Sequence, residues 1–171
     1  TDKFLYERSI SNIKYDPYRL PEADNADAVT TINSMKYLRG GVENVVIANV
    51  LNVIPEEAVR IRVLQQAKYA VKPDGKVYID SYNSGKEGIT KQGYQLGKPN
   101  KDYIDEIESV FGEGSAKIKN GYIEVTPKIV ITDPTKFDAV NLLDSIDPVI
   151  TGTGGPGKNK VVISDILDYF D

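Results

Sequence analysis

The sequence contains no cysteine and no histidine among its 171 residues. The absence of cysteine excludes disulfides, thiolate metal ligands and cysteine nucleophiles. The absence of histidine excludes histidine general bases, Ser-His-Asp triads and most zinc sites. Any chemistry must therefore use carboxylates, hydroxyls, amides, lysine or tyrosine, or depend on the reactivity of a bound cofactor.

Long runs of one residue class are also missing. No apolar stretch approaches the length of about 18 residues that a membrane-spanning helix needs, and no signal peptide opens the chain. These absences predict a cytoplasmic protein without a membrane partner. Lys and Arg number 21 against 25 Asp and Glu, a net charge of −4, with no run of basic residues. This balance argues against a protein that coats nucleic acid, although it leaves room for a local basic patch.

The middle of the chain predicts a βαβ unit. Residues 42–51 form a near-continuous apolar run, as in a fully buried strand of a parallel sheet. Pro55 and two glutamates then open an apolar pattern with helical spacing that continues to Ala70. Residues 72–75 read as a turn, and residues 76–80 as the next strand. A right-handed crossover between two parallel strands is the expected arrangement.

The flanking segments extend this unit into an α/β domain. Residues 23–38 predict a helix, residues 81–99 a mobile surface loop, and residues 102–111 a further helix. Two strands around residues 116–119 and 121–126 predict a hairpin turning at Asn120 and Gly121. We therefore expect one domain with a mostly parallel, doubly wound sheet and an antiparallel edge hairpin.

The two ends of the chain complement each other. Residues 163–171 resemble a first Rossmann strand running into its turn, and residues 1–8 resemble the helix that follows such a turn. A short strand ending in an acidic residue comes next, at residues 13–18. Joined tail to head, these segments give the order strand, helix, strand with a terminal Asp, which is the cofactor half of a doubly wound domain.

Four strings carry a resemblance to a known family. They are Tyr-Asp-Pro-Tyr at 15–18, Asn-Val-Leu-Asn-Val-Ile-Pro-Glu-Glu at 49–57, Val-Leu-Gln-Gln-Ala at 63–67 and the lysine-proline-x-glycine turn within 71–79. Together the strings resemble class I S-adenosylmethionine-dependent methyltransferases. The similarity is greatest to a branch found among bacteriophage proteins and methyltransferase-like proteins encoded with DNA-modification systems. A phage origin would imply the host cytoplasm as the location.

The order of these segments differs from that of the family. The resemblance places a glycine-rich strand-turn-helix before the Asp strand, whereas here its first strand stands at residues 161–171, after residues 1–127. Residues 128–160 form an extension or linker, and the family's short glycine run is absent. We interpret this order as a circular permutation opened at the cofactor loop, with a reordered fragment of a longer protein as the alternative. Loss of the glycines would weaken or abolish cofactor binding.

The segment before the displaced strand contains a second glycine-rich pattern. Gly152, Gly154 and Gly157 fit the dinucleotide fingerprint, and Lys158-Asn159 nearly completes a phosphate loop. Asn159 stands where a metal-binding hydroxyl belongs, and only twelve residues follow it. The preceding residues 147–150 form a weak strand interrupted by proline. A linker is the favoured interpretation, ahead of a displaced cofactor loop and a nucleotide-phosphate loop.

Five residues are candidates for cofactor binding. Asp16 ends a strand where a carboxylate can accept both ribose hydroxyls, a role that the resemblance also implies. Asn49 and Asn52 lie at the carboxyl end of the buried strand, where open α/β sheets bind ligands, and are candidates to face the methionine portion of the cofactor or the substrate. Tyr18 is a candidate for stacking near the adenine. The resemblance places Asp168 at the end of the first strand, close to the amino-acid end of the cofactor. Turn formation and capping are the structural alternatives for these residues.

Three functions compete at this point. The first is methyl transfer from S-adenosylmethionine to an unidentified acceptor, which needs little from the protein beyond positioning. The second is a catalytically silent methyltransferase fold that acts as a structural or interaction module. The third is nucleotide binding through the loop at residues 152–159, which the asparagine at position 159 disfavours. No catalytic residue and no metal ligand is predicted.

Overall fold

The computed structural model describes residues 2–16, 19–91, 93–128 and 160–165. The described helices and strands alternate along most of the chain, as expected for an α/β protein. The helical elements are α1 (Asp2–Tyr6), α2 (Glu22–Arg39), η1 (Leu51–Val53), α3 (Glu57–Ala70), η2 (Asn100–Tyr103) and α4 (Ile104–Phe111). The strands are β1 (Ser11–Tyr15), β2 (Val42–Ala48), β3 (Val71–Asp80), β4 (Gly88–Thr90), β5 (Gly93–Gln95), β6 (Ala116–Lys119), β7 (Tyr122–Val125) and β8 (Lys160–Asp165).

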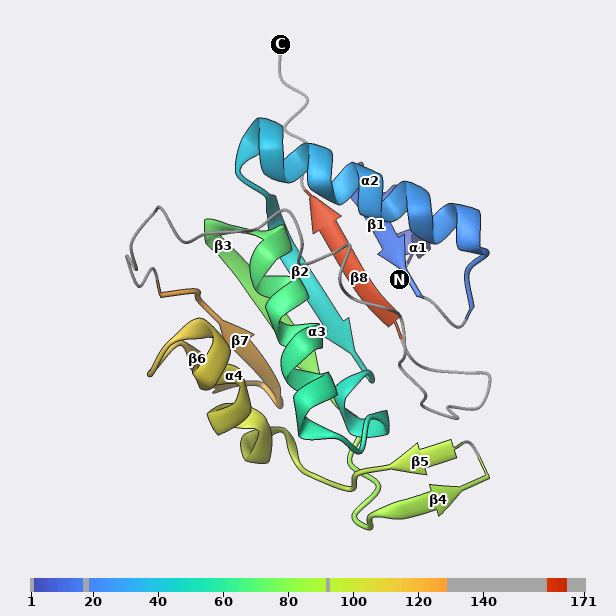
Figure 1. Ribbon diagram of the computed structural model, residues 1–171, viewed down its shortest axis with the longest axis vertical. Helices are drawn as coiled ribbons and strands as arrows, with labels where there is room; N and C mark the ends of the chain where they lie inside the picture. The colour runs from blue at the N-terminus through green and yellow to red at the C-terminus, as the bar shows by residue number, and fades with distance from the viewer. Residues whose placement is uncertain (1, 17–18, 92, 129–159, 166–171) are drawn as a thin grey trace.

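Six strands form the main sheet, in the order β1-β8-β2-β3-β7-β6 (Figure 1). Only the pair β2–β3 is parallel; the other four neighbouring pairs are antiparallel. The sheet is therefore mixed, and the prediction of a mostly parallel sheet was wrong. The reason is that two strands, β7 and β8, run against the direction shared by β1, β2, β3 and β6.

The predicted βαβ unit is confirmed. Strand β2 leads through η1 into α3, and β3 returns parallel to β2. Residues 72–75, expected as a turn before the strand, instead lie within β3, where the register moves from Val42–Val71 to Asn44–Lys76. They form a bulge. Gly41 permits this close approach, since a Cβ there would lie 2.4 Å from the Ala70 carbonyl oxygen.

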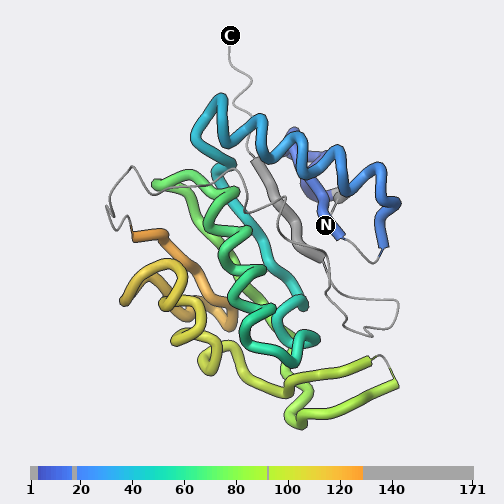
Figure 2. The backbone as a smooth tube through the Cα atoms, viewed as in Figure 1, coloured from blue at the N-terminus to red at the C-terminus, as the bar shows by residue number. Residues whose placement is uncertain are grey.

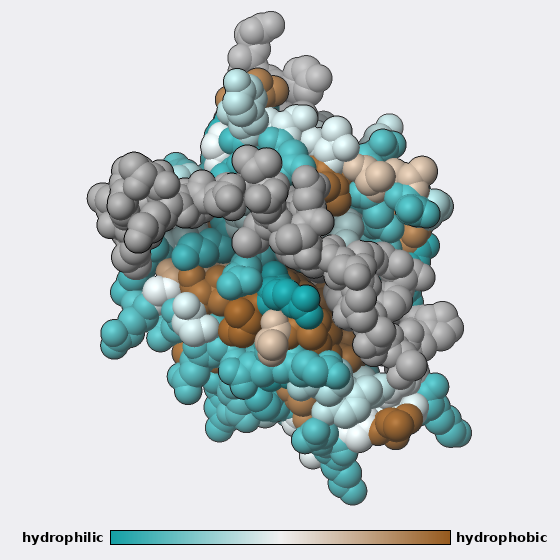
Figure 3. Space-filling model, in the orientation of Figure 1, coloured by the Kyte–Doolittle hydropathy of each residue, from teal (hydrophilic) through white to brown (hydrophobic). Residues whose placement is uncertain are grey.

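Helices α2, α3 and α4 lie in front of the sheet in the view of Figures 1 and 2, whereas α1 lies behind it near β1. The core fills the space between this front layer and the sheet. Alternate residues of the strands are buried there, among them Val45, Ile47, Val77 and Ile79. Figure 3 shows apolar side chains in the middle of this face, bordered by hydrophilic ones. Among the described residues, no helix is long and apolar enough to cross a membrane.

Two further segments differ in their agreement with expectation. The hairpin turning at Asn120 and Gly121 is confirmed, and both residues have the positive φ angles, 49° and 90°, of a two-residue turn. The segment 81–99, expected as a loop, contains a second hairpin formed by β4 and β5. Its three-residue strands are too short to produce a recognisable alternation in the sequence.

Strand β8 falls within the segment predicted as a displaced first strand, but it does not run in the direction that a first Rossmann strand has. It lies between β1 and β2. However, Asp165 pairs with Ser11, at the amino end of β1, and Lys160 pairs with Ala48, at the carboxyl end of β2. The carboxyl end of β8 therefore lies at the opposite sheet edge from Asp16.

The direction of β8 can be tested by cross-linking, because the chain has no cysteine of its own. Facing residues of an antiparallel pair have Cβ atoms about 5 Å apart, which a disulfide can bridge after small adjustments. We expect the double variant Ser11→Cys/Asp165→Cys to form a disulfide on mild oxidation, detected by mass spectrometry. In the matched variant Tyr15→Cys/Asp165→Cys the two positions lie about 13 Å apart, so no disulfide should form. The reverse result would show a parallel β8.

Candidate functional site

The carboxyl ends of β1, β2 and β3 lie at one edge of the sheet. Asp16 follows β1, Asn49 follows β2, and Asp80 ends β3. Ligands of open α/β sheets bind outside the carboxyl ends of the strands. This edge, which we call the carboxyl edge, is therefore where the predicted cofactor residues have to be assessed.

Asp16 is buried at the carboxyl edge, with 4% of its surface exposed. The side chain of Asn25 in α2 fixes its backbone: the Asp16 N–H donates to Asn25 Oδ1 (2.9 Å) and Asn25 Nδ2 donates to the Asp16 carbonyl (3.1 Å). The Leu20 N–H also donates to that carbonyl, at 3.0 Å. The carboxylate thus stands on a rigid corner between β1 and α2.

Asn49 joins the ends of β2 and β3. Its φ of 56° places it in the left-handed region, which asparagine tolerates better than most residues. Its N–H donates to the Asp80 carbonyl (2.8 Å), and its Oδ1 accepts from the Tyr82 N–H (2.9 Å). These bonds give Asn49 a structural task at the carboxyl edge, and its predicted contact with a cofactor stays a prediction.

Asn52 is almost completely buried in η1. Its Nδ2 donates to Gln95 Oε1 (2.8 Å), and its carbonyl accepts from the Leu96 N–H (2.7 Å), so it holds β5 against η1. Its Oδ1 is buried and accepts no hydrogen bond from the residues that the structure describes. The buried hydroxyls of Ser81 and Tyr103 likewise have no hydrogen-bond partner among those residues. Such atoms are satisfied in most proteins, commonly by ordered water or a ligand.

The remaining candidates lie outside the described residues. Tyr18 and Asp168 are among them, as is the glycine-rich pattern at 152–159, so the roles predicted for them stay predictions. The described part of β8 ends at Asp165, at the edge opposite Asp16. The structure thus brings Asp16, Asn49 and Asn52 to one side of the sheet, and it turns the strand that leads to Asp168 toward the other.

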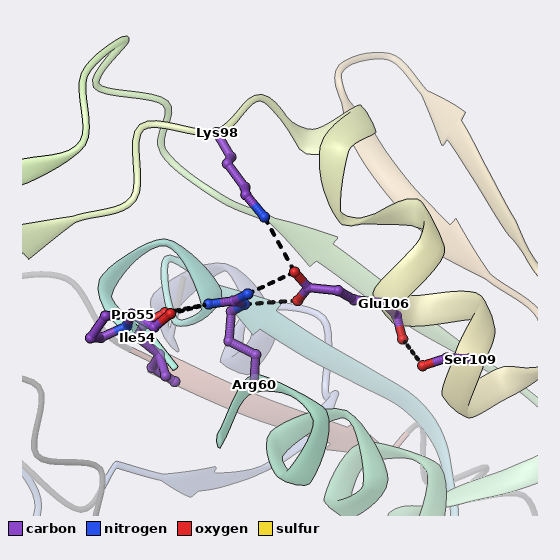
Figure 4. Close-up of polar contacts among 6 residues, drawn as sticks. All are labelled: Ile54, Pro55, Arg60, Lys98, Glu106 and Ser109. Atoms are coloured by element: carbon purple, nitrogen blue, oxygen red, sulfur yellow. Dashed lines mark hydrogen bonds and ion pairs between the residues drawn. The ribbon is translucent and has the colours of Figure 1, made fainter. Parts of the chain in front are cut away.

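A buried ion pair lies behind the carboxyl edge, between α3 and α4 (Figure 4). Arg60 donates through Nε and Nη2 to both oxygens of Glu106, each at 2.7 Å, and the two residues are 3% and 9% exposed. Arg60 Nη1 also donates to the carbonyls of Ile54 (2.9 Å) and Pro55 (2.7 Å), and Lys98 Nζ lies 3.3 Å from Glu106. This cluster connects α3 and α4 to the Ile54–Pro55 stretch before α3 and to the stretch around Lys98.

Charge and burial oppose each other in this cluster. Burial alone would raise the pKa of Glu106, but the hydrogen bonds and charges of Arg60 and Lys98 outweigh it and lower that pKa below its ordinary value of 4.5. At the neighbouring Tyr103 burial is the larger effect and the charge of Arg60 opposes it only in part, so the pKa of the hydroxyl is raised to about 12. Glu106 is thus a permanent anion at neutral pH and Tyr103 a permanent neutral hydroxyl, which suits neither for proton transfer.

The sequence interpretation missed this pair, although a signal for it exists. Arg60 stands one turn before Val63 and Leu64 on the buried stripe of α3, and Glu106 precedes Ile107 on that of α4. Opposite charges on the apolar stripes of two helices point to a buried ion pair.

Comparison with protein-family models, with curated proteins and with solved structures found no match for this chain. Within the described residues there is also no group of three or more acidic residues that could hold a metal ion.

Removal of the Glu106 charge should destabilise the protein strongly. In Glu106→Gln the buried Arg60 loses its counterion, and we expect a loss of about 3–5 kcal/mol in urea unfolding at pH 7. As a control, Glu43→Gln breaks the partly exposed pair with Lys72 and should cost less than about 1 kcal/mol.

The pH dependence has a definite sign. Because folding lowers the pKa of Glu106, its stabilisation is present above its unfolded pKa, near 4.5, and is lost as the pH falls through the folded value. The stability difference between wild type and Glu106→Gln should therefore shrink below about pH 4.5. A variant as stable as wild type at pH 7 would contradict the role given to the pair.

Proposed function

We propose that this chain is an S-adenosylmethionine-binding, methyltransferase-like domain that transfers a methyl group to an acceptor not yet identified. The observation that carries the proposal is the buried carboxylate of Asp16 on a rigid corner at the carboxyl end of β1. A carboxylate in this place suits the two hydroxyls of a ribose, which is how dinucleotide-binding domains hold the sugar. The Tyr-Asp-Pro-Tyr string that contains it is part of the family resemblance.

The strand order supports the same proposal. If β8 is counted as the first strand, then β1, β2 and β3 are the second, third and fourth, and β1-β8-β2-β3 reads as 2-1-3-4, part of the order 2-1-3-4-5 found in one class of doubly wound domains. We therefore propose that the chain is a circular permutation of that fold, opened at its cofactor loop. The switch in strand order lies between β8 and β2, beside Asn49, and ligands bind at such switch points.

The residues at the carboxyl edge fit such a cofactor in part. Asp16 would accept hydrogen bonds from the ribose, and the amide of Asn25 keeps it from moving. Asn49 and Asn52 already hold backbone segments, so they shape the edge more than they bind. A bound S-adenosylmethionine would supply an activated methyl group, so the protein's own task is to position the acceptor. A histidine-free edge is compatible with that task.

A second candidate is a catalytically silent methyltransferase-like fold that serves as a structural or interaction module. The direction of β8 favours it specifically. Since β8 runs antiparallel to β1 and β2, the strand that would lead into the cofactor loop ends at the far edge from Asp16. The backbone amides of such a loop would then not face the carboxyl edge.

Calorimetric titration with S-adenosylmethionine and with S-adenosylhomocysteine tests the first candidate. We expect micromolar binding by the wild type and at least a tenfold loss in Asp16→Asn, because the neutral amide weakens the hydrogen bonds that the carboxylate accepts. Asp27→Asn, an exposed change in α2, serves as the control and should bind as the wild type does. A cooperatively melting wild type that gives no heat at millimolar ligand would reject the cofactor site and leave the second candidate.

A further inference from the structure

Residues 81–101 form a basic arm on an acidic protein. This segment, called the basic arm below, contains four lysines and one glutamate, a net charge of +3 in a chain whose total is −4. It comprises the β4–β5 hairpin and its two flanking stretches. Figure 1 shows the hairpin standing beyond the end of the main sheet at which α3 begins.

The base of the arm is fixed to the carboxyl edge. Asn49 Oδ1 accepts from the Tyr82 N–H where the arm leaves β3, and Asn52 holds Gln95 where it returns. Gly97 has a φ of 67°, and a Cβ there would lie 2.4 Å from the carbonyl carbon of Lys86, so the two flanking stretches touch backbone to backbone. The base of the arm is therefore held in a defined place.

The charges of the arm are not balanced within it. Lys98 forms an ion pair with Glu106, which lies outside the arm, and Glu87 accepts a hydrogen bond from the Tyr94 hydroxyl at 2.5 Å. Lys86, Lys91 and Lys101 are all exposed, and none of them forms an ion pair with another described residue. Lys86 and Lys91 belong to the hairpin and the stretch before it, and Lys101 belongs to η2. Three solvated cations in one short segment of the chain attract a polyanion.

The arm also exposes one large apolar and one aromatic side chain, which a surface made only of charged and polar residues would not have. Ile89 is 87% exposed in β4 and Tyr82 is 56% exposed at the base. An exposed aromatic ring in the same segment as several lysines is the combination that binds single-stranded nucleic acids, since unpaired bases stack on the ring while phosphates meet the cations. A paired duplex hides its base faces, and an acidic protein surface gains nothing comparable from the ring.

We propose that the basic arm binds the backbone of a single-stranded nucleic acid through Lys86, Lys91 and Lys101, with Tyr82 stacking on a base. The proposal adds a partner and does not depend on cofactor binding. It also places the partner close to the carboxyl edge, because Asn49 connects Tyr82 to the end of β2.

Fluorescence anisotropy with a labelled thymidine oligomer of about 16 nucleotides tests the arm, without any cofactor present. Three phosphate contacts predict a slope of about −2 for log affinity against log salt, or roughly a 16-fold loss of affinity between 50 and 200 mM. The variant Lys86→Gln/Lys91→Gln/Lys101→Gln should remove most of this slope. Tyr82→Ser should lower affinity severalfold and leave the slope unchanged.

The control is a triple variant with the same change in net charge, Arg19→Gln/Arg39→Gln/Lys117→Gln, at exposed positions outside the arm. It should bind the oligomer as the wild type does. Equal losses in both triple variants, or no salt-dependent binding by the wild type, would overturn the proposal. Competition by polyglutamate as effective as that by unlabelled oligomer would point to an acidic protein partner and would also overturn it.

Discussion

The bidentate pair of Arg60 and Glu106 is the contact on which the arrangement of this protein depends most. Its four hydrogen bonds from Arg60 connect α3 to α4 and to the carbonyls just before α3. Lys98 adds the return stretch of the basic arm to the same carboxylate. A buried charge is costly without a partner, so every one of these groups is needed to keep the others in place. Together with the hydrogen bonds of Asn49 and Asn52, this contact helps to hold the basic arm and the stretch between η1 and α3 in place.

The carboxyl edge combines a stable corner with an unusual central strand. The Asp16 corner is fixed by Asn25, and Asn49 and Asn52 tie the ends of β2 and β3 to the arm. Between these two parts the edge receives the amino end of β8, since Lys160 lies next to Ala48. In a doubly wound domain the same place holds the carboxyl end of the first strand and its glycine-rich turn. The direction of β8 therefore bears directly on the two functions proposed for this edge.

The local sequence pattern predicted those helices, strands and turns whose form depends on their own residues. The βαβ unit, helix α2 and the Asn120–Gly121 hairpin were all readable from apolar period and turn chemistry. The direction of β8 was not readable, since a strand with the consecutive β-branched residues Val161, Val162 and Ile163 pairs equally well with neighbours of either direction. The sequence predicts a turn at residues 72–75 and not a bulge, because proline and glycine are typical of both.

The candidate site was less predictable than the fold, for a physical reason that concerns individual side chains. In a sequence, an asparagine next to the end of a strand is equally compatible with a ligand contact and with a capping role. Only the structure shows that Asn49 accepts a hydrogen bond from the Tyr82 N–H and that Asn52 donates one to Gln95. Arg60 and Glu106 read as solvated helix residues until the two buried stripes are considered together.

If both proposed binding elements exist, the hydrogen bonds of Asn49 and Asn52 connect them. Transfer of an already activated methyl group asks a protein mainly for positioning, and positioning requires that two binding elements be rigid relative to each other. Asn49 and Asn52 provide that rigidity, because they fasten the arm to the strand ends beside Asp16. A nucleic acid bound to the arm and a cofactor ribose bound by Asp16 would therefore lie at the same edge of the sheet. Asn49 and Asn52 would then fix the two binding sites relative to each other, and replacing these asparagines would disturb that arrangement without removing a contact to either ligand.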